Sequence, residues 1–67
     1  MEHLELDRLL TQKEVMALVG IRSRTSIYRR VKDGTFPPPV AMGHGQIRWR
    51  QSDFERWSKS LPNLQPL

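Results

Sequence analysis

Residues 23–34 read S-R-T-S-I-Y-R-R-V-K-D-G, and this stretch decides the fold that we expect for the chain. Ser23 is a suitable N-cap for a helix over 24–33, and Gly34 suits the left-handed position after its end. Ile27 and Val31 lie four residues apart, which predicts a narrow apolar stripe on that helix. The stretch also carries four cationic side chains, at Arg24, Arg29, Arg30 and Lys32.

The segment before this stretch predicts a second helix, over 12–19. T-Q-K-E at residues 11–14 is a capping box, in which the Thr11 and Glu14 side chains satisfy each other's backbone N–H groups. Gly20 suits the end of the helix. The predicted buried face consists of Val15, Leu18 and Val19, with Leu10 before the cap as a hydrophobic staple to Val15.

Only Gly20 to Ser23 separates the two predicted helices, so they pack as a helix-turn-helix. The second helix is the recognition helix of such a motif. At 100° per residue, its predicted outer face, opposite the apolar stripe, consists of Thr25, Ser26, Arg29 and Lys32.

The segment that follows predicts a connector and a β-hairpin. Thr35 to Pro39 contains three prolines and favours extended backbone. We interpret it as a stiff connector with Phe36 packed inward. The alternative is a proline-rich ligand for an aromatic groove. Residues 40–42 and 47–50 alternate apolar and other side chains around a four-residue turn over 43–46. The hairpin would turn Ile47 and Trp49 inward and Arg48 and Arg50 outward.

A third helix is predicted over 53–60. S-D-F-E at residues 52–55 reads as a second capping box. Its apolar stripe would consist of Phe54, Trp57 and Leu61. The fold class is therefore mainly α with a small β-hairpin wing, a winged helix-turn-helix. We expect a flexible segment over 1–8, the domain over 9–61 and a flexible tail over 62–67.

Composition narrows the function classes. The chain has eleven Lys and Arg against seven Asp and Glu, and eight of the eleven are Arg, which favours phosphate or guanine contacts. It has no cysteine, no apolar run of membrane-spanning length and no secretory signal, so we expect a cytoplasmic protein. His3 and His44 are far apart and outside any metal-binding motif. We expect no cofactor, no metal and no enzymatic activity.

Several motifs together resemble the AlpA-like prophage regulators, which are related to excisionases and to the DNA-binding domains of MerR-type proteins. The resemblance covers about residues 8–60. It is carried by S-R-x-x-I-Y-R from residue 23, by G-T-F-P-P-P from residue 34, and by R-W-x-x-S from residue 48 with Trp57. The turn here is one residue longer than the usual G-L-S, which adds Arg22 beside the expected DNA face.

The resemblance implies a transcriptional regulator that binds double-stranded DNA near prophage or integrative-element genes. We expect helix 24–33 in the major groove and wing 43–48 on the adjacent backbone. Tyr28 would either pack or reach a phosphate, and His44 would either enter a minor groove or contact nothing. The candidate DNA-binding residues are Arg22, Ser23, Arg24, Thr25, Ser26, Tyr28, Arg29, Arg30, Lys32, His44 and Arg48.

Two other functions stay open. One is an excisionase that bends DNA for an integrase, and the other is a winged helix used as a protein-interaction module. We expect a monomer in solution that assembles cooperatively on DNA, with RNA polymerase or an integrase as a further partner. The aromatic residues Trp49, Trp57, Phe54 and Phe36 are expected in the core rather than as stacking platforms for bases.

Overall fold

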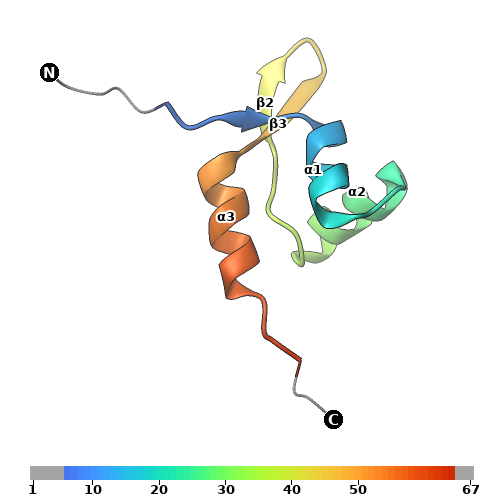
Figure 1. The fold of residues 1–67 in the computed structure, drawn as a ribbon. Coiled ribbons are helices and arrows are strands. Elements are labelled where there is room, and N and C mark those ends of the chain that lie inside the picture. The colour runs from blue at the N-terminus through green and yellow to red at the C-terminus, as the bar shows by residue number, and fades with distance from the viewer. Residues whose placement is uncertain (1–5, 65–67) are drawn as a thin grey trace, which may run out of the picture.

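A computed structural model describes residues 6–64, which form three helices and a three-stranded antiparallel sheet (Figure 1). Along the chain the elements are β1 (Leu9–Leu10), α1 (Gln12–Val19), α2 (Arg24–Asp33), β2 (Val40–Gly43), β3 (Gln46–Arg50) and α3 (Gln51–Ser60). This is the predicted architecture, a helix-turn-helix followed by a hairpin wing and a third helix. Strand β1 was not predicted, because two residues are too few to show an alternating pattern.

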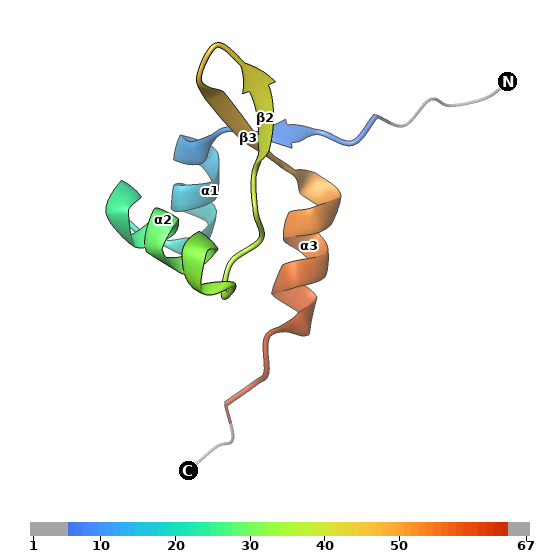
Figure 2. The same cartoon turned by 180° about the vertical axis from the view of Figure 1, so that it is seen from behind.

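The sheet has the order β1-β3-β2, so β3 is its central strand. Leu10 of β1 pairs with Trp49, and Val40 of β2 pairs with Arg48. Since β3 runs directly into α3, this strand connects the wing, the N-terminal segment and the last helix. Figure 2 shows the same arrangement from behind, with the hairpin projecting beyond the helices.

One small core holds these elements together. Its members come from β1, α1, α2, the connector and β3, and they are Leu10, Val15, Ile27, Phe36 and Trp49. Phe36 meets Trp49 edge to face, with 6.1 Å between the ring centroids. The Trp49 indole N–H donates to the Pro37 carbonyl over 2.7 Å. The connector therefore enters the core as predicted and is fixed there by a buried hydrogen bond.

The caps of the first two helices agree with the sequence. Thr11 Oγ1 accepts from the Glu14 N–H (3.0 Å), and Glu14 Oε1 accepts from the Thr11 N–H (2.9 Å), which completes the capping box. Both members of the predicted staple, Leu10 and Val15, are in the core. Gly20 closes α1 in the left-handed region at φ 74°.

The buried face of α1 differs from the prediction at one position. Leu18 is 64% exposed, while Met16, which was not predicted, packs against the core. Leu18 is turned toward α3 rather than toward the core, because it lines hollows whose other walls include Phe54 and Ser58. The i, i+3 spacing from Val15 was therefore a misleading signal in so short a helix.

The second predicted capping box is wrong. Helix α3 begins two residues earlier than expected, and its N-cap, Arg50, makes no side-chain capping bond. Ser52 instead lies inside the first turn and bonds to Asp7. The N–H of Gln51 donates to the Arg8 carbonyl over 2.8 Å. Residues distant in sequence thus cap this helix, and a local motif could not reveal them.

The aromatic stripe of α3 covers the outside of the core. Phe54 and Trp57 are half-buried and pack against Phe36, at centroid distances of 6.2 and 4.7 Å. The Trp57 indole N–H donates to the Thr35 carbonyl over 3.0 Å. Leu61, predicted as the end of the stripe, lies just after the helix and is 48% exposed.

Candidate nucleic-acid interface

Helix α2 is fixed at both ends and along one side. Ser23 Oγ accepts a 3.3 Å hydrogen bond from the Ser26 N–H, which caps its start as predicted. Gly34 ends it at φ 81°, and its N–H bonds back to carbonyls of the last turn. Ile27 is fully buried, so its position fixes the rotation of the helix about its axis. The remaining side chains consequently project in defined directions.

The outer face of α2 is basic and polar. At about 100° per residue, Thr25, Arg29 and Lys32 project within roughly 40° of the direction opposite Ile27. All three are exposed, as are Arg24 in the first turn and Tyr28 on one flank, whose exposed fraction is 53%. Within residues 24–32 the helix has no acidic side chain. This face presents hydrogen-bond donors and positive charge to whatever lies against it.

The exposed cations of α2 have no ion-pair partner in the part of the chain that the structure describes. Among residues 6–64 the ion pairs are Arg8–Glu14 and Arg56–Asp53, and neither involves α2. The side chains of Arg24, Arg29 and Lys32 therefore keep their full charge and donors for an external ligand. Arg22, in the preceding turn, is also exposed and adds to the positive charge near the start of the helix.

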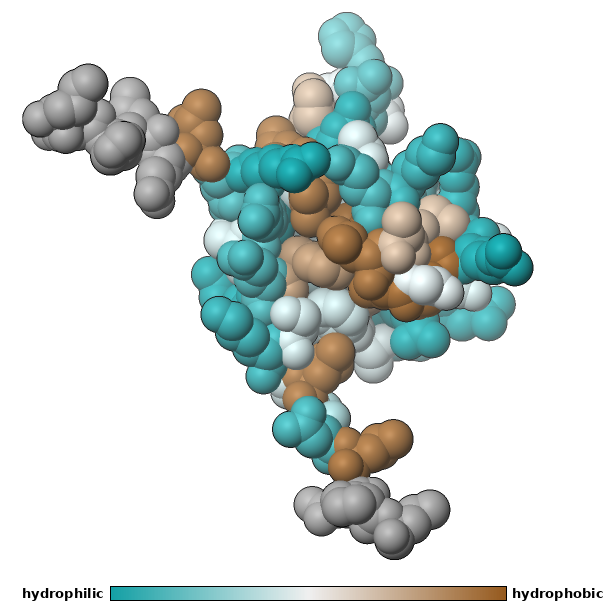
Figure 3. All heavy atoms as spheres, in the orientation of Figure 1, coloured by the Kyte–Doolittle hydropathy of each residue, from teal (hydrophilic) through white to brown (hydrophobic). Residues whose placement is uncertain are grey.

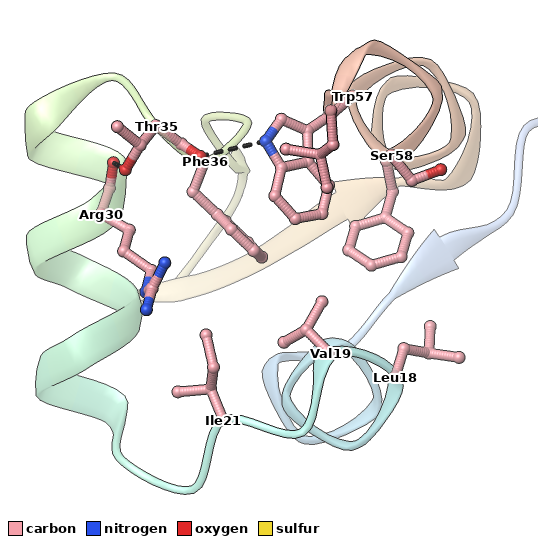
Figure 4. Close-up of a pocket in the computed structure, with 10 residues that line it drawn as sticks. Leu18, Val19, Ile21, Arg30, Thr35, Phe36, Trp57 and Ser58 are labelled. Carbon is pink, nitrogen blue, oxygen red and sulfur yellow. Dashed lines mark hydrogen bonds between the residues drawn. The ribbon is translucent and has the colours of Figure 1, made fainter. Parts of the chain in front are cut away.

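Two further predicted residues lie on the flank opposite Tyr28. Ser26 is half-buried there, although it was predicted among the outward residues. Arg30 is exposed, but its guanidinium points toward Ile21 at the mouth of a groove behind α2 (Figure 4). With Arg29, Asp33 and Thr35 they line a small polar hollow along that flank. Thr35, which sequence analysis did not include in the site, directly follows the C-cap glycine and is exposed there.

The wing is tighter than predicted. His44 and Gly45 alone form the loop, and both have positive φ, 54° and 75°, as a type I′ hairpin turn requires. The expected four-residue turn is therefore a two-residue one, since Gly43 and Gln46 already pair. The register shifts between Ala41 and Gly43. His44 is exposed at the tip, so its ring is free to contact a ligand.

Arg48 does not project freely from the wing. Its side chain is half-buried, and its guanidinium donates to the Ile47 carbonyl over 2.8 Å. Arg50 is exposed but pairs with Leu9 at the other end of β3, beside the start of α3. The two arginines therefore lie at different places, and the structure places only Arg48 on the wing itself.

Neither a metal centre nor a membrane span accompanies this surface in the described chain. In residues 6–64 no three side chains of His, Cys, Asp or Glu come together in a way that would hold a metal ion. No helix in the same part of the chain has the length and apolar character needed to cross a membrane.

Two comparisons with known proteins find relatives of this chain. The family model described as prophage CP4-57 regulatory protein (AlpA) matches residues 8–61. The curated protein ORF88 of Enterobacteria phage P4, itself described as uncharacterized, is 39% identical over 51 residues, which are 76% of this chain. The matched part is 57% of the length of that relative. No solved structure matches the chain.

Proposed function

Because the chain belongs to the family of the prophage CP4-57 regulatory protein AlpA, we propose that it is a sequence-specific regulator that binds double-stranded DNA. Its targets would be the promoters of prophage or integrative-element genes. The observation that carries the proposal is the basic surface of α2, where Arg29 and Lys32 on the outer face and Arg24 in the first turn are exposed and unpaired within the described chain. A rigid, capped helix with such a face suits the major groove of B-DNA.

Within the groove, Arg29 is the residue best placed to read a base. It projects from the middle of the outer face, and a guanidinium can donate two hydrogen bonds to guanine O6 and N7. Thr25, one turn earlier on the same face, would contact a base edge or a thymine methyl group. Arg24 and Arg22 at the start of the helix, and Lys32 near its end, would hold the phosphates on either side.

The wing would bind the backbone next to this groove. Its two-residue turn brings little bulk, so the His44 side chain and the main chain at the tip can approach phosphates closely. Arg48 is held against the Ile47 carbonyl and would contribute positive charge along the wing rather than a base contact. The wing would thus set the orientation of the domain on DNA, and α2 would supply the specificity.

One small domain gives a short footprint and modest affinity. We therefore infer a monomer in solution that acts through repeated sites bound side by side, with RNA polymerase as a further protein contact. The same arrangement serves an excisionase that bends DNA for an integrase, and this is the alternative function. Deleting the gene separates the two: lost excision with unchanged promoter activity would favour the excisionase.

The direct test is a footprint over the DNA upstream of the protein's own gene, followed by competition binding. We expect a protected sequence that a random duplex does not compete away. Arg29→Ala should weaken binding to this sequence and reduce its preference over random DNA. Each good bidentate contact with a base contributes about 1–3 kcal/mol of discrimination.

Arg56→Ala is the matched control, since it removes the same side chain and charge from an exposed position on α3. It should leave the preference for the protected sequence intact. If specific and random duplexes bind alike, and Arg29→Ala changes neither, the groove-reading role fails. The domain would then be read as a protein-interaction module for an acidic partner.

A further inference from the structure

An apolar groove lies behind α2, between the end of α1, the connector and α3 (Figure 4). Its volume is about 550 Å³. The apolar walls consist of Leu18, Val19, Ile21, Phe36, Phe54 and Trp57. The Arg30 guanidinium stands at one side of the mouth, facing Ile21. The groove therefore combines aromatic walls with a cationic donor at its edge.

Two leucine side chains of this groove are exposed to solvent. Leu18 and Leu61 both line the groove and are 64% and 48% exposed. Figure 3 shows apolar surface at the centre of this face, with hydrophilic residues around it. Neither leucine contributes to the core, nor do they belong to the basic face of α2. Contiguous apolar surface with a polar rim is typical of a binding site.

The segment after α3 has a matching pattern. Residues 61–67 read L-P-N-L-Q-P-L, with a leucine at every third position, two prolines and no charged side chain. A polyproline II helix has three residues per turn, so this spacing would place the leucines on one side. Leu61 already has φ −70° and ψ 135°, close to that conformation, and Pro62 restricts it to extended backbone.

Residues 62–64 do not lie in the groove of their own chain. From the end of α3 they lead away from the body of the protein (Figures 1 and 2), and Leu64 is 95% exposed. A return of these residues to the groove would require a reversal of the chain at Leu61. The backbone angles of Leu61 and the ring of Pro62 oppose this reversal. Each copy thus presents both an open groove and an apolar segment.

We propose that residues 62–67 of one copy bind in this groove on a second copy, while Leu61 stays on the groove of its own copy. Polyproline II segments dock in aromatic-lined grooves because their conformation is preformed and their carbonyls are free. Here Phe36 and Trp57 would receive the leucines and prolines, while Arg30 would donate to a segment carbonyl. A segment without charged side chains suits this site, because Arg30 is its one charged lining residue and a backbone carbonyl is a sufficient hydrogen-bond acceptor for it.

The contact joins two different surfaces of the protein, so each bound copy still has one of the two surfaces free. Further copies can therefore be added in a row on neighbouring DNA sites. One such contact is small and is weak in free solution. On adjacent sites the segment and the groove are held near each other, which raises their effective concentration. Self-association itself requires no DNA and can be tested in its absence.

Intermolecular paramagnetic broadening tests the proposal. The chain has no cysteine, so Asn63→Cys gives a single position for a nitroxide label. Labelled protein at natural isotope abundance is mixed with unlabelled ¹⁵N protein, so that only contacts between copies broaden the observed signals. We expect concentration-dependent broadening of the Val19 and Ile21 amides and of the Trp57 indole N–H.

The controls are placed in the labelled copy, so that the observed copy keeps its native sequence and fold. Leu64→Asp should abolish the broadening. Leu6→Asp should not, because Leu6 is 88% exposed and lies outside the groove. The proposal is overturned if the mixed sample shows no broadening, or if Leu64→Asp leaves the broadening unchanged. None of these results bears on DNA binding by α2.

Discussion

Asp7 accepts two hydrogen bonds from Ser52, a residue 45 positions further along the chain. One comes from the backbone N–H at 3.0 Å and the other from the hydroxyl. The next residue, Arg8, accepts from the Gln51 N–H with its carbonyl. Two of the backbone donors that any helix start leaves open are therefore satisfied by the opposite end of the domain.

The first prediction concerns the acid stability of this contact. The hydroxyl and the backbone N–H of Ser52 both favour the carboxylate and lower the pKa of Asp7. A lowered folded-state pKa means that the stabilisation is complete above the unfolded value, about 3.9, and is lost as the pH falls through the folded value. Asp7→Asn should therefore lower the Tm at neutral pH, and this deficit should shrink below about pH 4.

Thermal unfolding followed by circular dichroism across the acidic range measures this difference. Ser52→Ala serves as the companion variant, because it removes the hydroxyl but keeps the backbone N–H bond to Asp7. We expect it to have the smaller deficit. A deficit for Asp7→Asn that is the same at every pH would mean that the carboxylate charge is not what stabilises the start of α3.

The second prediction ranks the two tryptophans. Trp49 is fully buried and bonded to the Pro37 carbonyl, so Trp49→Ala should cost about 3–5 kcal/mol. Trp57 is half-buried on α3, and Trp57→Ala should cost less than Trp49→Ala. Urea unfolding monitored by circular dichroism gives both values. The reverse order would place the centre of the core under α3 instead of under β3.

The third prediction concerns the hairpin turn. Gly45 has φ 75°, and an added Cβ would meet no atom within 4 Å, so Gly45→Ala tests backbone conformation alone. A left-handed residue other than glycine costs roughly 1–2 kcal/mol, and we expect a loss near the lower end. Gly45→Asn should lose less, since asparagine tolerates this conformation. Equal losses in the two variants would point to a different cause.

The fourth prediction separates phosphate contacts from base contacts. Lys32→Ala should weaken specific and random DNA binding alike, and should reduce the slope of log K against log salt by about 0.9. Lys59→Ala, on the exposed last turn of α3, should leave the slope unchanged. Titrations at several salt concentrations measure the slopes. An unchanged slope for Lys32→Ala would remove this residue from the interface.

Local signals predicted the first half of the fold. The bounds of α1 and α2 follow from caps that lie within a few residues of each helix, at Thr11, Gly20, Ser23 and Gly34. The burial of Phe36 and Trp49 follows from their places in a proline connector and an alternating strand. The errors arise where residues distant in the sequence determine how a helix begins. Asp7 and Arg8 cap α3, so the apparent capping box at residues 52–55 has no role.

The candidate site was predictable in part for the same reason. The direction of Arg29 and Lys32 depends on helical periodicity and on buried Ile27, both of which are visible in the sequence. Arg30 and Arg48 were harder, because one turns toward a groove and the other bonds to a neighbouring carbonyl. Both side-chain orientations depend on packing between segments, and the periodicity of apolar residues in the sequence does not predict such packing.

The central place of β3 in the sheet also governs when the protein can acquire its fold during synthesis. Helices α1 and α2 leave the ribosome early, yet the Trp49 side chain that completes their core is translated sixteen residues after α2 ends at Asp33. A nascent chain or a truncated product that stops within the wing lacks that side chain and cannot hold α2 in place. The folded arrangement of α2 is therefore acquired only once translation has passed β3, and a product that ends before β3 lacks the proposed DNA-binding surface.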